Sequence, residues 1–152
     1  MRRAVLAAGL VLTVASACRR APDVGASATV GQVTVRRAVA WTMNEVQSAT
    51  AGFELDVAQG TDTLLAVSSP AGRAGLHATQ GPGGMHEIAS LPLASGRTMV
   101  DGRTVHVMVQ DLAADIPIGG TLPLELRFAR AGTVELAVPV LRFSEALTAL
   151  GR

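Results

Sequence analysis

Apolar and polar side chains alternate along much of this chain, which is the pattern of β-strands that bury one face and expose the other. The alternation is clear at residues 53–57 and returns at residues 122–128 and 134–140. Gly132 lies between the last two runs, which predicts an antiparallel hairpin with a glycine turn. Short runs of this kind, separated by glycine at fairly regular intervals, predict an all-β sandwich or barrel.

The first residues have a different pattern, that of a secretory signal peptide over residues 1–17. Two arginines precede an apolar run, and residues 15–17 form a small-residue cleavage site. The apolar run is too short for a comfortable membrane span. Residues 18–29 are rich in small and polar side chains and predict a tether. We therefore expect the folded domain to occupy residues 30–141.

The end of the chain, residues 142–152, predicts a short helix. Ser144 is a suitable N-cap, and good helix formers follow it. A chain of 152 residues is long enough for one domain but not for two. The sequence therefore predicts one β-sandwich with a helical tail.

The single cysteine, Cys18, directly follows the small residues of the cleavage site. This is where a bacterial lipoprotein carries its lipid, although Ala15 stands where the lipid-modification motif normally has Leu or Val. Lipidation at Cys18 and plain signal-peptide cleavage both remain open. With one cysteine, no intramolecular disulfide can form. We expect an exported protein of the periplasm or cell envelope, with membrane association only through a lipid anchor.

The charge balance excludes one class of partner. The formal net charge is +1, so no basic excess argues for nucleic acid. No Ser/His/Asp set, nucleophile elbow, phosphate-binding loop or paired-carboxylate motif stands out. We therefore do not expect an enzyme.

The most informative motif is a His-x-Met pair, His106 and Met108, within the strand-like run of residues 105–110. Because side chains alternate along a strand, the valines of this run can face a core while His106 and Met108 share the other face. His77 and Met85 precede them in the chain. Imidazole and thioether are uncharged and soft or borderline donors, so this set favours Cu(I) over zinc, calcium or magnesium. Taken singly, however, a His or Met on a strand is more often a packed or exposed side chain than a ligand.

The order of these residues, a His, a later Met and then a His-x-Met pair, resembles the bacterial periplasmic copper chaperones of the PCu(A)C family. Residues 62–70, 106–112 and 118–121 also resemble that family. The resemblance implies a cupredoxin-like Greek-key β-sandwich and an exported chaperone that holds Cu(I). It implies that the acceptor is the copper centre of cytochrome c oxidase, sometimes together with a second, thiol-bearing copper chaperone. It assigns as metal ligands His77, Met85, His106 and Met108.

The segment around Met85 departs from the family pattern. The loop between His77 and Met85 is shorter, and the usual Met-rich stretch is reduced to one methionine. His86, the next residue, could replace Met85 as the loop ligand. A blue-copper electron carrier is excluded, because such a centre needs a cysteine thiolate beside two histidines and Cys18 lies in the leader.

The altered loop leaves a second class of function open. If the site has decayed, the domain is a structural or protein-binding β-sandwich lipoprotein that binds no metal. Whether the four ligands converge distinguishes the two hypotheses. The other methionines of the domain are assigned to packing: Met43 follows Trp41 and is expected to pack against it, and Met99 fits a strand position.

Overall fold

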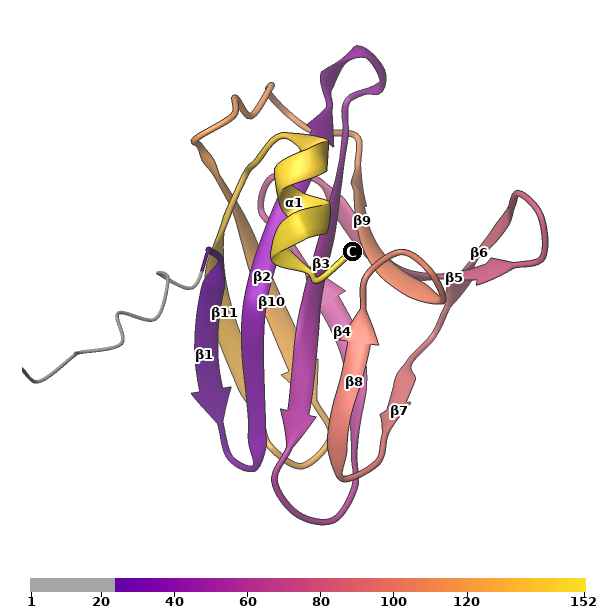
Figure 1. Cartoon of the computed structure of the whole chain (residues 1–152), viewed down its shortest axis with the longest axis vertical. Helices are drawn as coiled ribbons and strands as arrows, with labels where there is room; N and C mark the ends of the chain where they lie inside the picture. The colour runs from indigo at the N-terminus through magenta and orange to yellow at the C-terminus, as the bar shows by residue number, and fades with distance from the viewer. Residues whose placement is uncertain (1–23) are drawn as a thin grey trace, which may run out of the picture.

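The computed structural model describes residues 24–152, which form two β-sheets and a short C-terminal helix (Figure 1). The predicted signal peptide and Cys18 lie outside the described residues. Within residues 24–152, no helix is long and apolar enough to cross a membrane. The elements in chain order are β1 (Ala26–Val30), β2 (Val33–Met43), a 3-10 turn (Asn44–Val46), β3 (Ser48–Val57), β4 (Asp62–Ser68), β5 (Arg73–Gln80), β6 (Gly84–Ile88), β7 (Leu91–Leu93), β8 (Gly96–Val100), β9 (Val105–Gln110), β10 (Thr121–Phe128), β11 (Thr133–Pro139) and α1 (Phe143–Ala149).

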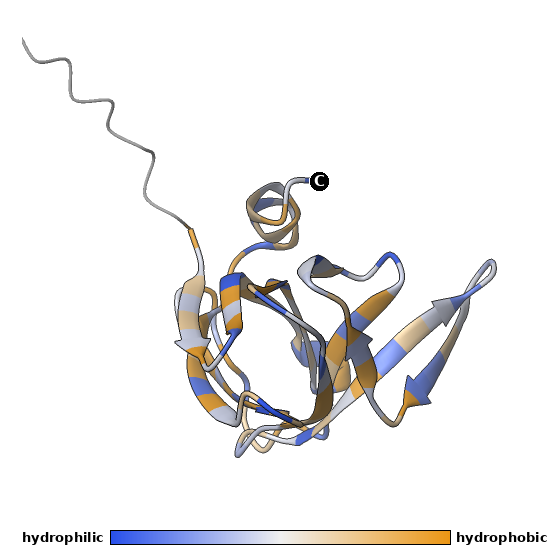
Figure 2. Ribbon diagram, turned by 90° about the horizontal axis from the view of Figure 1, so that it is seen from below, coloured by the Kyte–Doolittle hydropathy of each residue, from blue (hydrophilic) through white to orange (hydrophobic). Residues whose placement is uncertain are grey.

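The first sheet has the strand order β1-β2-β3-β9-β5-β6, and β8 pairs with the later half of β3. The second sheet has the order β11-β10-β4-β7. Every pair of neighbouring strands in the two sheets is antiparallel. Seen from below, the strands surround a common interior (Figure 2). The predicted all-β sandwich with a short C-terminal helix is confirmed.

The core between the sheets is built mainly from aliphatic side chains. In the first sheet, alternate residues of β3 and β9 point inward, and in the second sheet the alternate residues of β10 meet them. This arrangement leaves the other face of the first sheet free for α1 and for the site described below. The core includes Val33, Val35, Phe53, Leu55, Leu64, Val107, Val109, Leu122, Leu124, Leu126, Phe128 and Val138.

The predicted C-terminal hairpin is confirmed by the antiparallel pairing of β10 with β11. Gly132 in its turn has φ of 105°, a left-handed conformation that favours glycine. Pro123 lies outside the part of β10 that pairs with β4, and Pro139 is the last residue of β11. Neither proline therefore removes a donor from the middle of a ladder.

The predicted tether is too long, because residues 26–29 belong to β1. This strand pairs with β2 at the edge of the first sheet, and the side chains of Ala26 and Ala28 pack against the core. Small residues are typical of a tether, but they also fit an edge strand that lies close to its neighbours. The folded domain therefore begins before Val30, the residue from which we expected it.

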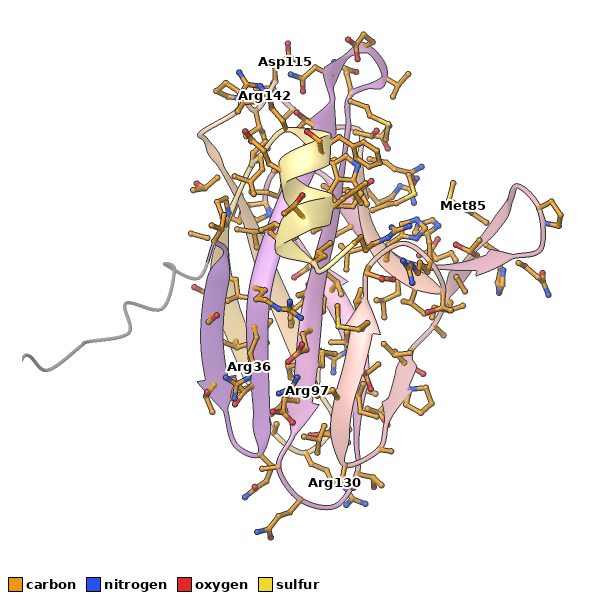
Figure 3. The ribbon with its side chains drawn as sticks, viewed as in Figure 1. Arg36, Met85, Arg97, Asp115, Arg130 and Arg142 are labelled. Carbon is orange, nitrogen blue, oxygen red and sulfur yellow. The ribbon has the colours of Figure 1, made fainter. Side chains whose placement is uncertain are left out.

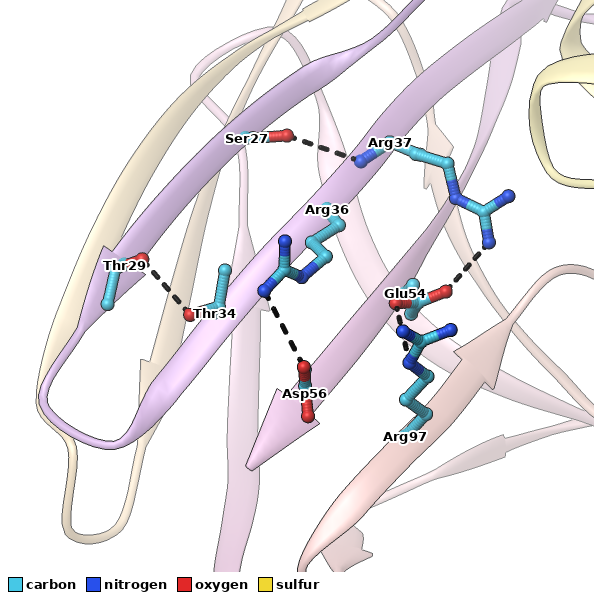
Figure 4. Close-up of polar contacts among 8 residues, drawn as sticks. All are labelled: Ser27, Thr29, Thr34, Arg36, Arg37, Glu54, Asp56 and Arg97. Atoms are coloured by element: carbon cyan, nitrogen blue, oxygen red, sulfur yellow. Dashed lines mark hydrogen bonds and ion pairs between the residues drawn. The ribbon is translucent and has the colours of Figure 1, made fainter. Parts of the chain in front are cut away.

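The outer face of β3 is less solvated than its alternating pattern predicts. Glu54 points to this face and is nonetheless buried. Its carboxylate pairs with the guanidinium groups of Arg37 at 2.7 Å and Arg97 at 3.5 Å (Figure 4). Two arginines thus compensate a charge that would be costly to bury alone.

The predicted C-terminal helix is confirmed, but it begins at Phe143, two residues earlier than an N-cap at Ser144 would allow. The N-cap is Arg142, whose backbone N–H donates to the Glu145 carboxylate at 3.1 Å. The helix packs on the outer face of the first sheet (Figure 1). A Cβ on Gly52 would lie only 2.7 Å from the Leu150 side chain, so the missing side chain at Gly52 makes room for the end of the helix.

At the far end of the sandwich, the Asp62 carboxylate fastens β4 to the β10–β11 turn. It accepts hydrogen bonds from the backbone N–H groups of Thr63 at 2.7 Å, Arg130 at 3.0 Å and Ala131 at 2.8 Å. Burial alone would raise the pKa of Asp62, but these hydrogen bonds outweigh burial and hold the pKa below its ordinary value.

Replacing Asp62 with Asn should lower the free energy of unfolding at pH 7 by about 1–3 kcal/mol. The side-chain NH₂ of asparagine would take the place of one carboxylate oxygen, so that a donor would face a backbone N–H donor. Because the pKa of Asp62 is lowered in the folded state, its ionised carboxylate stabilises the fold fully at pH values well above the unfolded-state pKa of about 3.9. This stabilisation is lost as the pH falls below that value. Urea unfolding should therefore show the difference between wild type and variant shrinking from about pH 5 to pH 3. Asp115→Asn, at an exposed position, is the matched control, and equal effects of the two variants would contradict the assignment.

Candidate metal centre

The two histidines of the predicted ligand set face each other across adjacent strands. β9 pairs with β5 so that His106 lies directly opposite His77. Their rings stack with centroids 5.9 Å apart and planes inclined by 22°. The pairing register thus brings together two residues that are 29 positions apart in the chain (106 − 77).

Met108 lies on the same face as His106, as the alternation predicts. Val107 and Val109, between and beside them, are fully buried in the core on the other face. Opposite Met108 are Gly75 on β5 and Thr50 on β3. Because Gly75 has no side chain and Thr50 has a short one, the space around Met108 is left open.

Met85 reaches the same face from β6, on the hairpin that projects from the body of the sandwich (Figure 3). It lies opposite Thr79, two residues beyond His77, so it shares the face of His77. Its side chain is 58% exposed. His86 lies opposite Ala78 and takes the other face, because neighbouring residues of a strand point in opposite directions. This register favours Met85 over His86 as the loop ligand.

Three of the four predicted ligands line one hollow of about 250 Å³. The fourth, His77, stacks on His106 at its side. The remaining wall comes from β2, β3, the β8–β9 turn and the C-terminal segment. The residues that line the hollow are Trp41, Met43, Thr50, Met85, Asp101, Gly102, His106, Met108, Phe143 and Arg152.

The prediction that Met43 belongs to the core is wrong. Met43 is 39% exposed and lies in the wall of the hollow. The Trp41 ring packs against Phe143 of α1, edge to face, with centroids 5.5 Å apart. The helix, whose role the sequence did not indicate, therefore supplies an aromatic partner for Trp41.

The environment of His106 is compatible with metal binding. Its side chain is only 4% exposed, and its Nδ1 atom is buried without a hydrogen-bond partner. Burial lowers the pKa of His106 below the ordinary histidine value, and the charge of nearby His77 lowers it further. At neutral pH the imidazole is uncharged and offers a lone pair, which is the form that binds a metal. Since buried polar atoms are nearly always bonded, the unpartnered nitrogen fits a site for a metal ion.

Glu87 is a neighbour of the site that the sequence did not single out. Glu87 lies on β6, opposite His77 on β5, and its carboxylate lies next to Gly75. The Glu87 Oε1 and His77 Nε2 atoms lie 3.0 and 3.5 Å from the position that a Gly75 Cβ would take. A carboxylate beside an imidazole is the usual partner that orients a metal-binding histidine. Only the β5–β6 register reveals it, because nothing in the spacing of Glu87 links it to His77.

The donor types decide which metal the site suits. Within residues 24–152, no three side chains from among His, Cys, Asp and Glu stand where they could share a metal ion. The donors gathered around the hollow are instead imidazoles and thioethers. Thioether and imidazole together suit Cu(I).

The fold resembles three solved structures, each of which is matched over nearly its whole length. The copper-bound PCuAC domain from PmoF2 matches with a TM-score of 0.66 and 19% identity over 76% of this chain and 97% of that domain. The apo PCuAC domain from PmoF1 matches with a TM-score of 0.67 and 19% identity over 75% and 97%. Apo-DR1885 from Deinococcus radiodurans, a solution structure, matches with a TM-score of 0.52 and 19% identity over 93% and 96%. The likeness confirms the resemblance to PCu(A)C proteins, and at this identity it concerns the fold.

In sequence, the family of LpqE-like lipoproteins matches residues 12–140. No curated protein matches the chain. The family match includes all four predicted ligands and ends before α1, so the helix that borders the hollow lies beyond it.

The buried nitrogen of His106 generates a prediction about stability. Replacing His106 with Leu in the metal-free protein should leave the free energy of unfolding unchanged or raise it, because the change removes a buried polar group that has no partner. Val107→Ala, the neighbour on the core face, should lower it by about 1–3 kcal/mol through the cavity it leaves. Urea unfolding measures both. A loss of more than about 1 kcal/mol in His106→Leu would mean that this imidazole has a structural role.

Proposed function

The chain belongs to the LpqE-like lipoprotein family, and on that premise we propose that it is an exported chaperone that binds Cu(I) and delivers it to an acceptor. The observation that carries the proposal is the unpartnered, uncharged imidazole of His106 beside thioethers in one open hollow. The PCuAC fold of the described residues agrees with it, and one of the solved domains with this fold is copper-bound.

The proposed ligands are His77, Met85, His106 and Met108. A thioether has no proton to lose when it binds copper, and an imidazole needs only to be in its uncharged form. Cu(I) is a soft ion, and thioethers bind it without adding charge to a largely apolar hollow. Glu87 would orient His77 rather than bind the metal, since a carboxylate is a harder donor.

The placement of Met85 suits delivery of the ion. Its exposed side chain stands on β6, the edge strand of the first sheet, whereas His106 is buried in the middle of the sheet. An acceptor can therefore approach the ion from the hairpin side and exchange its own ligands for those of the chaperone. The resemblance to PCu(A)C proteins suggests the copper centre of cytochrome c oxidase, or a thiol-bearing copper chaperone, as that acceptor.

The proposed location is the outer side of the cytoplasmic membrane. The signal peptide over residues 1–17, the position of Cys18 and the lipoprotein family support export and a lipid anchor. Because β1 begins at Ala26, the tether after Cys18 has only seven residues, 19–25. Fully extended, it would span about 25 Å, which would hold the domain near the membrane surface.

Titration with Cu(I) against a chromophoric chelator, without oxygen, tests the proposal. The full chain carries Cys18→Ser so that no thiol competes for the ion. We expect one bound equivalent, loss of binding in the His106→Ala, Met108→Ala double variant, and binding weakened more than about tenfold in Met85→Ala. His86→Ala, one residue away on the opposite face, is the matched control and should bind like the parent. Equal weak binding by parent and double variant would favour a structural or protein-binding domain instead.

Trp41 provides an independent readout, because it is the only tryptophan of the chain and lines the hollow. Binding of Ag(I), a soft surrogate for Cu(I) without redox chemistry, should change Trp41 emission and saturate at one equivalent. The double variant should show no such change. If emission changes equally in both proteins, the ion binds somewhere else.

A further inference from the structure

Met43 stands on the same sheet face as the proposed ligands. It is the last residue of β2 and lies opposite Ser48 on β3. Trp41, two residues earlier, lies opposite Thr50, which in turn lies opposite Met108 on β9. Since partners across a ladder share a face, Met43 and Met108 point to the same side with β3 between them.

Packing does not explain why a methionine is at this position. More than a third of the surface of Met43 is exposed, and the neighbouring Trp41 packs against α1. Of the four methionines in residues 24–152, Met43, Met85 and Met108 line the hollow, and only Met99 does not. Met99 lies on β8 opposite Glu54. The thioethers of the described domain are therefore gathered at one place.

A second observation marks the same area as a place for a ligand. Ser48, the direct partner of Met43, is buried, and its hydroxyl has no hydrogen-bond partner. His106, in the wall of the hollow, also has a buried atom without a partner. Unpartnered buried polar atoms are rare, so two of them on one face indicate that the protein does not complete this surface by itself.

The strand spacing shows what Met43 can reach. With neighbouring strands about 4.8 Å apart and a rise of about 3.4 Å per residue, the Cα atoms of Met43 and Met108 are separated by about 12 Å. An ion that lies between the two side chains is within reach of both sulfur atoms. Such an ion is displaced from the histidine pair toward β2.

We propose that Met43 is a further Cu(I) ligand, which binds the ion with Met108 at a second, outer position in the hollow. This inference rests on the proposed function. The ion moves outward when a bond from Cu(I) to the Met43 sulfur forms and a bond to a histidine nitrogen breaks. The copper stays Cu(I), and no proton or electron is transferred. The outer position is where the ion would leave for its acceptor.

The test follows individual methionines by NMR in the full chain with Cys18→Ser, labelled with ¹³C in the Met methyl groups and titrated with Ag(I). The signals of Met43, Met85 and Met108 should shift, and that of Met99 should not. Assignment uses one Met→Leu variant for each signal. If Met85 and Met108 shift while Met43 does not, the inference is wrong and the proposed function stands. If none of the three shifts, both are wrong.

A kinetic measurement tests the outer position directly. Met43→Leu, which keeps an apolar side chain of similar volume, should slow the release of Cu(I) to a chelator about tenfold, or about 1.4 kcal/mol in activation free energy. Its equilibrium affinity should change less, by about threefold at most, because the inner ligands remain. Met99→Leu is the matched control and should release the ion at the parent rate. Release from Met43→Leu at the parent rate would overturn the proposal.

Discussion

The pairing of β9 with both β3 and β5 is the constraint on which the core and the site depend. One register places Val107 and Val109 in the core and His106 and Met108 on the outer face. The same register sets His77 opposite His106. A slip of one residue would exchange the faces, exposing the valines and burying the donors, so the energy of burying the valines also holds the donors in place.

The site is maintained at some cost to stability. His106 is buried, unpartnered and kept uncharged by its surroundings, whereas an apolar residue would pack there without an unsatisfied atom. Gly75 is likewise a glycine inside a strand, which weakens the strand, and a Cβ there would lie only 3.0 Å from the Glu87 carboxylate. These residues are unfavourable in a sandwich that only has to fold, and they agree with the proposed ligand, which would complete the surface.

The sequence predicts those features of the fold that depend on the order of residues within a single strand or hairpin. Alternation identified the strands, the hairpin around Gly132 and the opposite faces of Val107 and His106. It could not place Met43 or Glu87, because their neighbours are fixed by the pairing of strands and by the docking of a helix, which periodicity within one strand does not encode. The sequence did not predict β1, because small residues suit a tether and an edge strand equally well.

The C-terminal helix determines the character of the hollow. Leu150 packs over Gly52, and Phe143 packs on Trp41, so the end of the chain is fixed beside the proposed ligands. Arg152 is held by the Asp101 carbonyl at 2.9 Å and lines the same hollow. The wall therefore holds both a guanidinium and the Asp101 carboxylate, and these opposite charges offset each other near a bound cation. On the proposed function, retention of Cu(I) would then come from the bonds to sulfur and nitrogen, which can exchange one at a time when an acceptor offers better donors.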